Sequence, residues 1–150
     1  MRRKLLFCAV VIFLTGCSTG KLTTASGRPE IRIQATPKVT LTRIVQWAPS
    51  VGQLVLRADT NLWFVTTTHK MNAYLNGFPL PSNVDATTTF TIVPMMDSVV
   101  IYEQRMIAYV SQEKDKYGHM NPQHHYDQYT TQRAYDEMQA ELVQIASKMK

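Results

Sequence analysis

The stretch from Thr87 to Val110 (TTTFTIVPMMDSVVIYEQRMIAYV) decides the fold. Thr87–Val93 and Ser98–Val110 are rich in β-branched and aromatic residues, which are typical of strands. Pro94–Asp97 between them contains residues that favour a turn. The stretch therefore predicts a β-hairpin. The apolar alternation of its second strand changes phase near Glu103-Gln104, which predicts a bulge or bend there.

A first hairpin is predicted upstream of this one. Leu54–Ala58 alternates between the two faces of a strand, Asp59–Asn61 is a turn, and Leu62–Thr68 is β-branched and aromatic. His69–Asn76 predicts a short helix. Gly77–Ser82 contains glycine and proline and interrupts regular structure.

The pattern before the first hairpin predicts a strand and then a helix. Glu30–Ala35 alternates apolar and polar residues, which is typical of a half-buried strand. Thr36 suits the N-cap of a helix and Pro37 its first position. One helical face is then apolar, and it consists of Leu41, Ile44, Val45 and Ala48.

The C-terminal part predicts a loop followed by a helix. Ser111–Tyr129 is polar and has no period, which favours a loop. Thr130 or Thr131 caps a helix that extends to about Lys148. Its apolar stripe is Tyr135, Met138, Leu142, Ile145 and Met149. We expect this stripe to pack on the protein's own sheet, with a partner protein as the alternative.

Together these elements predict an α+β fold in the order β-α-β-β-(α)-β-β-α. A meandering antiparallel sheet of about five strands, with the helices on one face, would bury the apolar faces. Residues 30–150 then form one domain, and a chain of this size buries enough surface for a stable core.

The N-terminus predicts export. Met1–Lys4 is basic, and Leu5–Leu14 is an apolar run of ten residues. Because a membrane-spanning helix needs about 20 residues, this run is typical of a secretory signal segment. Ser18–Pro29 is rich in Ser, Thr and Gly and predicts a flexible tether.

Leu14-Thr15-Gly16-Cys17 resembles the lipobox of bacterial lipoproteins. The resemblance implies that residues 1–16 are a signal peptide and that cleavage occurs before Cys17. It also implies that the Cys17 thiol carries diacylglycerol and that the new amine is acylated, for example with palmitate. In such Gram-negative lipoproteins a residue other than Asp after the cysteine, here Ser18, accompanies export to the outer membrane. Residues 17–29 would then link the lipid to the domain.

The remaining layout resembles a group of small Gram-negative envelope lipoproteins of unknown function. The resemblance rests on Thr23–Ile33, with its Ser26-Gly27-Arg28-Pro29-Glu30 core, and on the order of the following elements. It implies no catalytic residues.

Charge and cysteine content agree with this origin. The formal charge is +5, but removing Arg2, Arg3 and Lys4 with the signal segment leaves 13 basic and 11 acidic residues. A net charge of +2 without a basic cluster argues against nucleic acid as a partner. Removal of Cys8 leaves Cys17 as the cysteine of the mature chain.

Few side chains are of the types and spacings that indicate catalysis or metal binding. His119, His124 and His125 lie near Asp127 and could bind a transition metal. However, adjacent histidines on an extended chain point to opposite sides, so we expect no metal site there and no catalytic residue elsewhere. Asp136 and Glu137 do not share a helix face, whereas Glu137 and Glu141 do, and these predict solvated charges.

The sequence therefore predicts a non-enzymatic lipoprotein without a cofactor, held by Cys17 on the periplasmic side of the outer membrane. There it would bind or assemble with another envelope protein. The alternative is a periplasmic ligand- or metal-binding module that uses the segment His119–Asp127.

Overall fold

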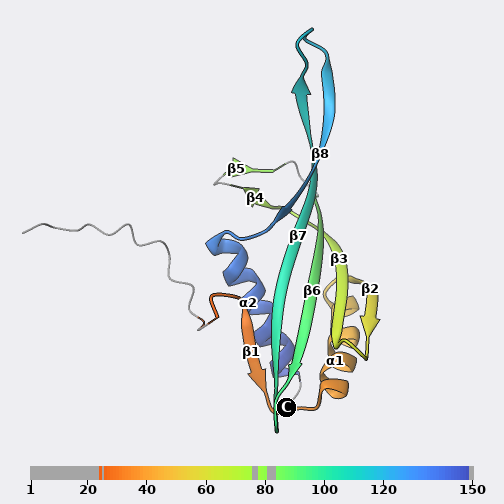
Figure 1. Cartoon of the computed structure of the whole chain (residues 1–150), viewed down its shortest axis with the longest axis vertical. Helices are drawn as coiled ribbons and strands as arrows, with labels where there is room; N and C mark the ends of the chain where they lie inside the picture. Colours follow the sequence, from red (N-terminus) through yellow and green to blue (C-terminus); the bar gives the residue numbers. More distant parts are fainter. Residues whose placement is uncertain (1–23, 25, 76–77, 81–83, 149–150) are drawn as a thin grey trace, which may run out of the picture.

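The structure, a computed structural model, describes residues 24, 26–75, 78–80 and 84–148. It is an α+β fold, as predicted, with two helices on one face of an antiparallel sheet (Figure 1). The elements are β1 (Glu30–Ile33), α1 (Pro37–Ser50), β2 (Leu54–Asp59), β3 (Phe64–Met71), β4 (Tyr74–Leu75), β5 (Phe78–Pro79), β6 (Val84–Pro94), β7 (Val99–Lys114), β8 (Met120–Gln128) and α2 (Gln132–Ser147).

The main sheet has six strands in the order β1-β7-β6-β3-β2, and β8 also pairs with β7. One edge of β7 pairs with β6. The other edge is shared, because β1 pairs with residues 99–102 and β8 with residues 106–114. Two backbone hydrogen bonds connect the segments at this junction, from Glu103 N to Pro29 O (3.1 Å) and from Tyr129 N to Arg105 O (2.9 Å).

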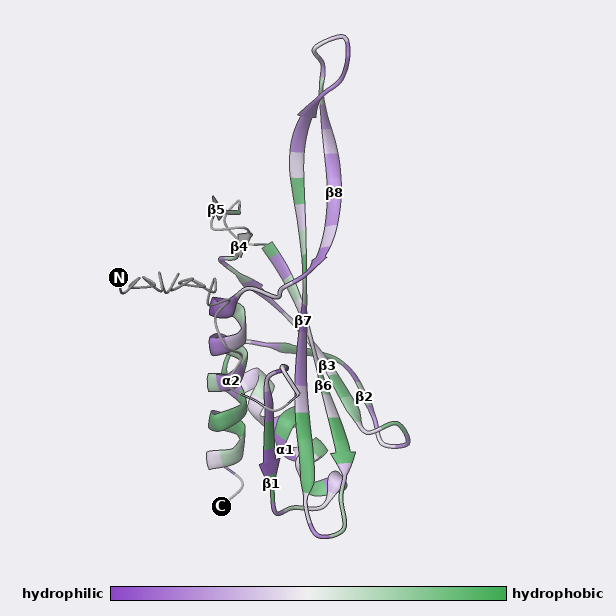
Figure 2. Cartoon of the chain, turned by 60° about the vertical axis from the view of Figure 1, so that its left-hand side comes forward, coloured by the Kyte–Doolittle hydropathy of each residue, from purple (hydrophilic) through white to green (hydrophobic). Residues whose placement is uncertain are grey.

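β7 and β8 extend beyond the rest of the sheet. Pairing of β7 with β6 ends at Ala108, whereas pairing with β8 continues to Lys114. Residues 109–125 therefore form a two-stranded projection, and together with the pair Ala108–Tyr126 at its foot they make up what we call the arm (Figure 1). Figure 2 shows that the arm is mostly hydrophilic, whereas hydrophobic residues gather in the opposite half of β6, β7 and α2.

Both main helices begin where the sequence predicts. The Thr36 side chain accepts a hydrogen bond from Val39 N (3.3 Å), and Thr131 accepts one from Ala134 N (3.1 Å). Each threonine satisfies an otherwise free backbone donor of the first helical turn. After α1, Gly52 takes a φ of 79°, which a residue with a side chain rarely adopts.

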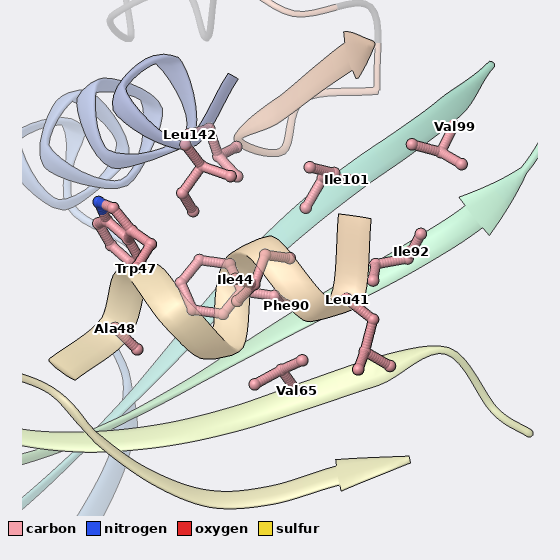
Figure 3. Packing of buried hydrophobic residues seen from close by; sticks show 11 residues of the cluster. Leu41, Ile44, Trp47, Ala48, Val65, Phe90, Ile92, Val99, Ile101 and Leu142 are labelled. Carbon is pink, nitrogen blue, oxygen red and sulfur yellow. The ribbon is translucent and has the colours of Figure 1, made fainter. Parts of the chain in front are cut away.

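The helices bury two hydrophobic clusters against the sheet. The first cluster joins α1, the sheet and the C-terminal half of α2, and includes Leu41, Ile44, Trp47, Phe90, Ile101, Leu142 and Ile145 (Figure 3). The second includes Ala86, Ile107, Tyr129, Ala134 and Met138. The stripe of the C-terminal helix thus packs on its own sheet, as expected; Met149 lies outside the described residues.

Three local predictions are wrong. The helix predicted from His69 to Asn76 is absent from the described residues, because β3 continues to Met71 opposite Val84. The bulge predicted at Glu103-Gln104 is not there either. The β6–β7 register runs without interruption, and the register shift lies in β2 between Val55 and Arg57.

The predicted loop Ser111–Tyr129 is the third error. Most of it forms the end of β7 and all of β8, which supply the sixth strand and the arm. The arm has no hydrophobic core to cover, so its sequence lacks the apolar alternation by which strands are recognised.

Candidate functional site

The arm carries the three histidines that the sequence analysis singled out, but it separates them. His124 pairs with Val110 and His125 with Tyr109, and neighbouring residues of a strand point to opposite faces. His119 lies in the turn, with its Nδ1 3.4 Å from Asp115 Oδ2. Among the residues that the structure describes, no three His, Cys, Asp or Glu side chains are grouped so that they could hold a metal ion.

One face of the arm is held together by side chains. The rings of Tyr109 and His125 stack with centroids 4.8 Å apart, and Ser111 Oγ lies 2.7 Å from His125 Nε2. Tyr109 also donates a hydrogen bond to Asp127 Oδ2 (2.9 Å), and this bond raises the pKa of the phenol. These cross-strand contacts order a ribbon that would otherwise be marginally stable.

The tip of the arm is a closed turn around Asp115. Asp115 Oδ1 accepts hydrogen bonds from His119 N (2.9 Å) and Tyr117 N (2.8 Å). These bonds, led by the one from His119, lower the pKa of Asp115. Gly118 takes a φ of 85°, which allows the chain to reverse. The tip is thus a defined structure that presents Tyr117 with 73% of its surface exposed.

The other face of the arm offers apolar and aromatic side chains to the solvent. Tyr126, opposite Ala108, is 73% exposed, Val110 is 42% exposed, and Met120 at the end of the ribbon is 53% exposed. Tyrosine and methionine are enriched in protein–protein interfaces. We call Val110, Met120 and Tyr126 the outer face of the arm.

A buried ionic group lies below the arm, between the two hydrophobic clusters. Arg105 is 2% exposed, and its Nη2 donates to Glu103 Oε1 (2.8 Å) and to Glu141 Oε1 (2.7 Å). Its Nε donates to Thr88 Oγ1 (3.0 Å), and its Nη1 lies 3.9 Å from Glu137 Oε2. We call these five residues the Arg105 cluster. It connects β6, β7 and α2 through charge-assisted hydrogen bonds.

The protonation of this cluster is unusual. Burial, reinforced by the charge of Glu141, raises the pKa of Glu103 well above 4.5, although Arg105 opposes the shift. Glu103 Oε2 is buried without a hydrogen-bond partner among the described residues, which a neutral carboxyl tolerates better than a charged one. Nearby, burial and the charge of Arg105 lower the pKa of His69.

The sequence pattern did not indicate this cluster. It predicted solvated charges at Glu137 and Glu141, but their side chains are only 32% and 22% exposed and both face Arg105. The carboxylates contributed by α2 therefore serve as partners of a buried cation. One feature of the sequence could have indicated the cluster. The apolar alternation of β7 is interrupted at Glu103, and Glu103 and Arg105 occupy the inward positions that apolar residues hold elsewhere in the strand.

A cavity of about 530 Å³ lies at the junction of β1 and β8 beside β7. Its wall contains Pro29, Tyr129, Tyr135 and Met138, and Glu103 and Arg105 contribute to it. Residues 27–29, which the sequence assigns to the tether, thus lie against the domain. The atoms Glu103 Oε2 and Tyr129 Oη are both buried, so a molecule in this cavity would not contact them.

The described part of the chain contains no helix that is long and apolar enough to cross a membrane. Cys17 and the signal segment lie outside the described residues. Comparisons of the chain with models of protein families, with curated proteins and with solved structures find no match. The function must therefore be argued from the geometry and the sequence.

Proposed function

We propose that this protein is a lipid-anchored envelope protein that acts, without catalysis, as a binding or assembly module, and that its arm makes the contact with another envelope protein. The lipid on Cys17 would hold it to the periplasmic side of the outer membrane. The observation that carries the proposal is the arm itself, a two-stranded projection that is ordered but adds little to the hydrophobic core.

The chemistry of the arm supports a protein as its ligand. The outer face exposes Val110, Met120 and Tyr126, and the tip exposes Tyr117. Such rigid aromatic and apolar groups give a large contact area for little loss of conformational entropy. Within the described residues β7 is the strand that pairs with β8, so a strand of a partner could add to the other edge of β8.

The lipid anchor is supported by the sequence alone. The basic start, the ten-residue apolar run and Leu14-Thr15-Gly16-Cys17 follow one another in the order of a lipoprotein signal. Two or three acyl chains anchor a protein stably, whereas one chain binds only marginally. For the alternative of a metal site at His119–Asp127 we find no favouring observation, since the three imidazoles diverge.

The proposal is tested in two measurements on protein extracted from separated envelope fractions. Intact mass should give the chain Cys17–Lys150 plus acyl groups in the outer-membrane fraction. A photo-reactive side chain at Tyr126 or Met120 should then give a cross-linked adduct of one defined mass. Gln46, which is exposed on α1, serves as the matched control position and should give no such adduct.

Two results would contradict the proposal. A soluble product without acyl chains would refute the anchor. Adduct formation that is equal at Tyr126 and Gln46, or absent from both, would refute the arm as the contact surface.

A further inference from the structure

The end of the molecule opposite the arm exposes apolar side chains. Met96 is fully exposed (103%), and Met95, Val39 and Leu62 are 44%, 48% and 67% exposed. Met95 and Met96 lie in the β6–β7 turn, Leu62 in the β2–β3 turn, and Val39 in the first turn of α1. We call these four residues the base. In Figure 1 the β6–β7 turn and the start of α1 lie at the lower end of the molecule, and the β2–β3 turn lies to their side and somewhat above them, all away from the arm.

The base is a shared surface, although its residues come from three separate connections. Ile92 N donates to Trp63 O (2.8 Å), so the β2–β3 turn lies beside the end of β6. A hollow of about 420 Å³ is lined by Thr36 and Pro37 on one side and by Met95 and Met96 on the other. The tips therefore project from the same end of the domain.

This exposure is not what turns usually show. Turn tips favour Gly, Pro, Asn, Asp and Ser, whereas here two methionines and a leucine occupy them. Trp63 has a φ of 53°, which L side chains rarely adopt, and its side chain packs against the first hydrophobic cluster. Since Trp63 turns inward, the preceding Leu62 is left outside.

The length of the tether decides which end can reach a membrane. The tether meets the domain where Pro29 O accepts from Glu103 N. Gly27 N donates to Thr24 O, so the chain turns beside this point. Cys17 is seven residues before Thr24, so the segment between them spans at most about 23–25 Å when fully extended. Met96 lies in the turn before β7, seven residues from Glu103, and is therefore no more than about 23 Å away.

The arm lies outside that range. β7 ends at Lys114, eleven residues from Glu103 and about 36 Å away by the same spacing, and the tip lies beyond it. An arm directed at the bilayer would need a longer tether than the chain provides. A base directed at the bilayer lies within the available length.

We propose that the base inserts Met95, Met96 and Leu62 into the interface of the phospholipid bilayer that anchors the chain, and that the arm consequently points away from it. This inference rests on the proposed lipid anchor at Cys17. It explains why a turn carries two adjacent exposed methionines, since flexible apolar side chains enter the boundary between headgroups and acyl chains readily.

The test uses the full lipidated protein, which has no free thiol once Cys8 has left with the signal segment and the Cys17 thiol carries diacylglycerol. Met96→Cys and Leu62→Cys are labelled with an environment-sensitive fluorophore, and Lys116→Cys at the arm tip is the matched control. Each is reconstituted in vesicles of phosphatidylethanolamine and phosphatidylglycerol that contain brominated phosphatidylcholine. We expect blue-shifted emission at positions 96 and 62, with at least about twofold stronger quenching than at 116, since interfacial groups are buried by about 5–10 Å.

A second variant tests whether the two turns enter the bilayer together. In the Met95→Asp/Met96→Asp background, quenching at position 62 should fall toward the level of the arm tip. The intact mass of each preparation distinguishes failure of the lipid anchor from failure of the proposed orientation. Acylated protein with unquenched labels at 96 and 62, or with stronger quenching at 116, overturns the orientation and leaves the anchor standing. Protein without acyl chains overturns both.

Discussion

Arg105 shows how a single buried charge can organise this fold. Moving a cation out of water costs several kcal/mol, so it must be compensated by charge and hydrogen bonds. Glu103 comes from the same strand, whereas Glu137 and Glu141 come from α2. α2 therefore supplies two of the carboxylates that compensate the cation buried in the sheet. These ion pairs fix the position of α2 along the sheet.

Removing this charge is expected to destabilise the fold strongly. Arg105→Met should lower the free energy of unfolding by about 3–5 kcal/mol, because it removes the hydrogen-bond donor of buried Glu103 and the counter-charge of Glu141. Arg133→Met is the control, since Arg133 pairs with Glu137 at an exposed position and such pairs contribute less than about 1 kcal/mol. Urea unfolding of both variants measures the difference. Similar midpoints for the two variants would contradict the assigned role of Arg105.

The raised pKa of Glu103 predicts a pH dependence. Between the usual value of 4.5 and the higher value in the folded protein, the folded state binds more protons than the unfolded state. The contribution of Glu103 to the free energy of unfolding is complete below pH 4.5 and is lost as the pH rises through the pKa of Glu103 in the folded protein. The Gln side chain of Glu103→Gln stays neutral, so this variant should not show the loss. The difference between its free energy of unfolding and that of the natural chain should therefore rise with pH. Urea midpoints of both chains between about pH 4 and pH 8 test this, and parallel curves would refute it.

At the scale of elements, the sequence predicts those parts that face a hydrophobic core. The cap Thr36, a cap at Thr130 or Thr131, the apolar faces of both main helices and the two hairpins were predicted, because periodicity and capping residues mark buried and terminal positions. Polar strands were missed. Glu103 looked like a change of phase because an ion pair occupied a core position, and His69–Met71 lacked the apolar pattern of a strand although β6 pairs with it.

The arm is an element that the rest of the fold should tolerate losing in part. Replacing residues 112–122 by Asn-Gly leaves Ser111 opposite Gln123, and this dipeptide closes a two-residue hairpin. The stability of the body should change by no more than about 0.5 kcal/mol, as for surface substitutions. The yield of the adduct at Tyr126 should fall, because the variant lacks Met120 and Tyr117 and keeps only Val110 and Tyr126 of the outer face. Ile107→Ala, at a fully buried position of the same strand, should cost about 2–5 kcal/mol. Thermal and urea unfolding provide the comparison, and loss of folding in the shortened protein would show that the arm is structural.

At the scale of the whole molecule, β7 connects the two proposed surfaces. Its 16 residues span about 53 Å at strand spacing. The strand begins next to the base and ends in the arm, and the Arg105 cluster fixes α2 to its middle. A contact at the arm would therefore be held at a set distance from the bilayer, which suits a protein that positions a partner at the membrane surface.

The anchor on which this arrangement depends makes a prediction for the two cysteines. Cys17→Ala removes the thiol that accepts the lipid, so the chain should take up no labelled palmitate and should keep residues 1–16, because the lipoprotein peptidase requires the modified cysteine. Cys8→Ala changes the other cysteine, within the apolar run, and should mature and acquire lipid normally. Palmitate labelling with intact mass distinguishes the two variants. If Cys17→Ala matured to the normal length, cleavage would follow another signal, and neither the tether length nor the orientation of the arm could be derived from Cys17.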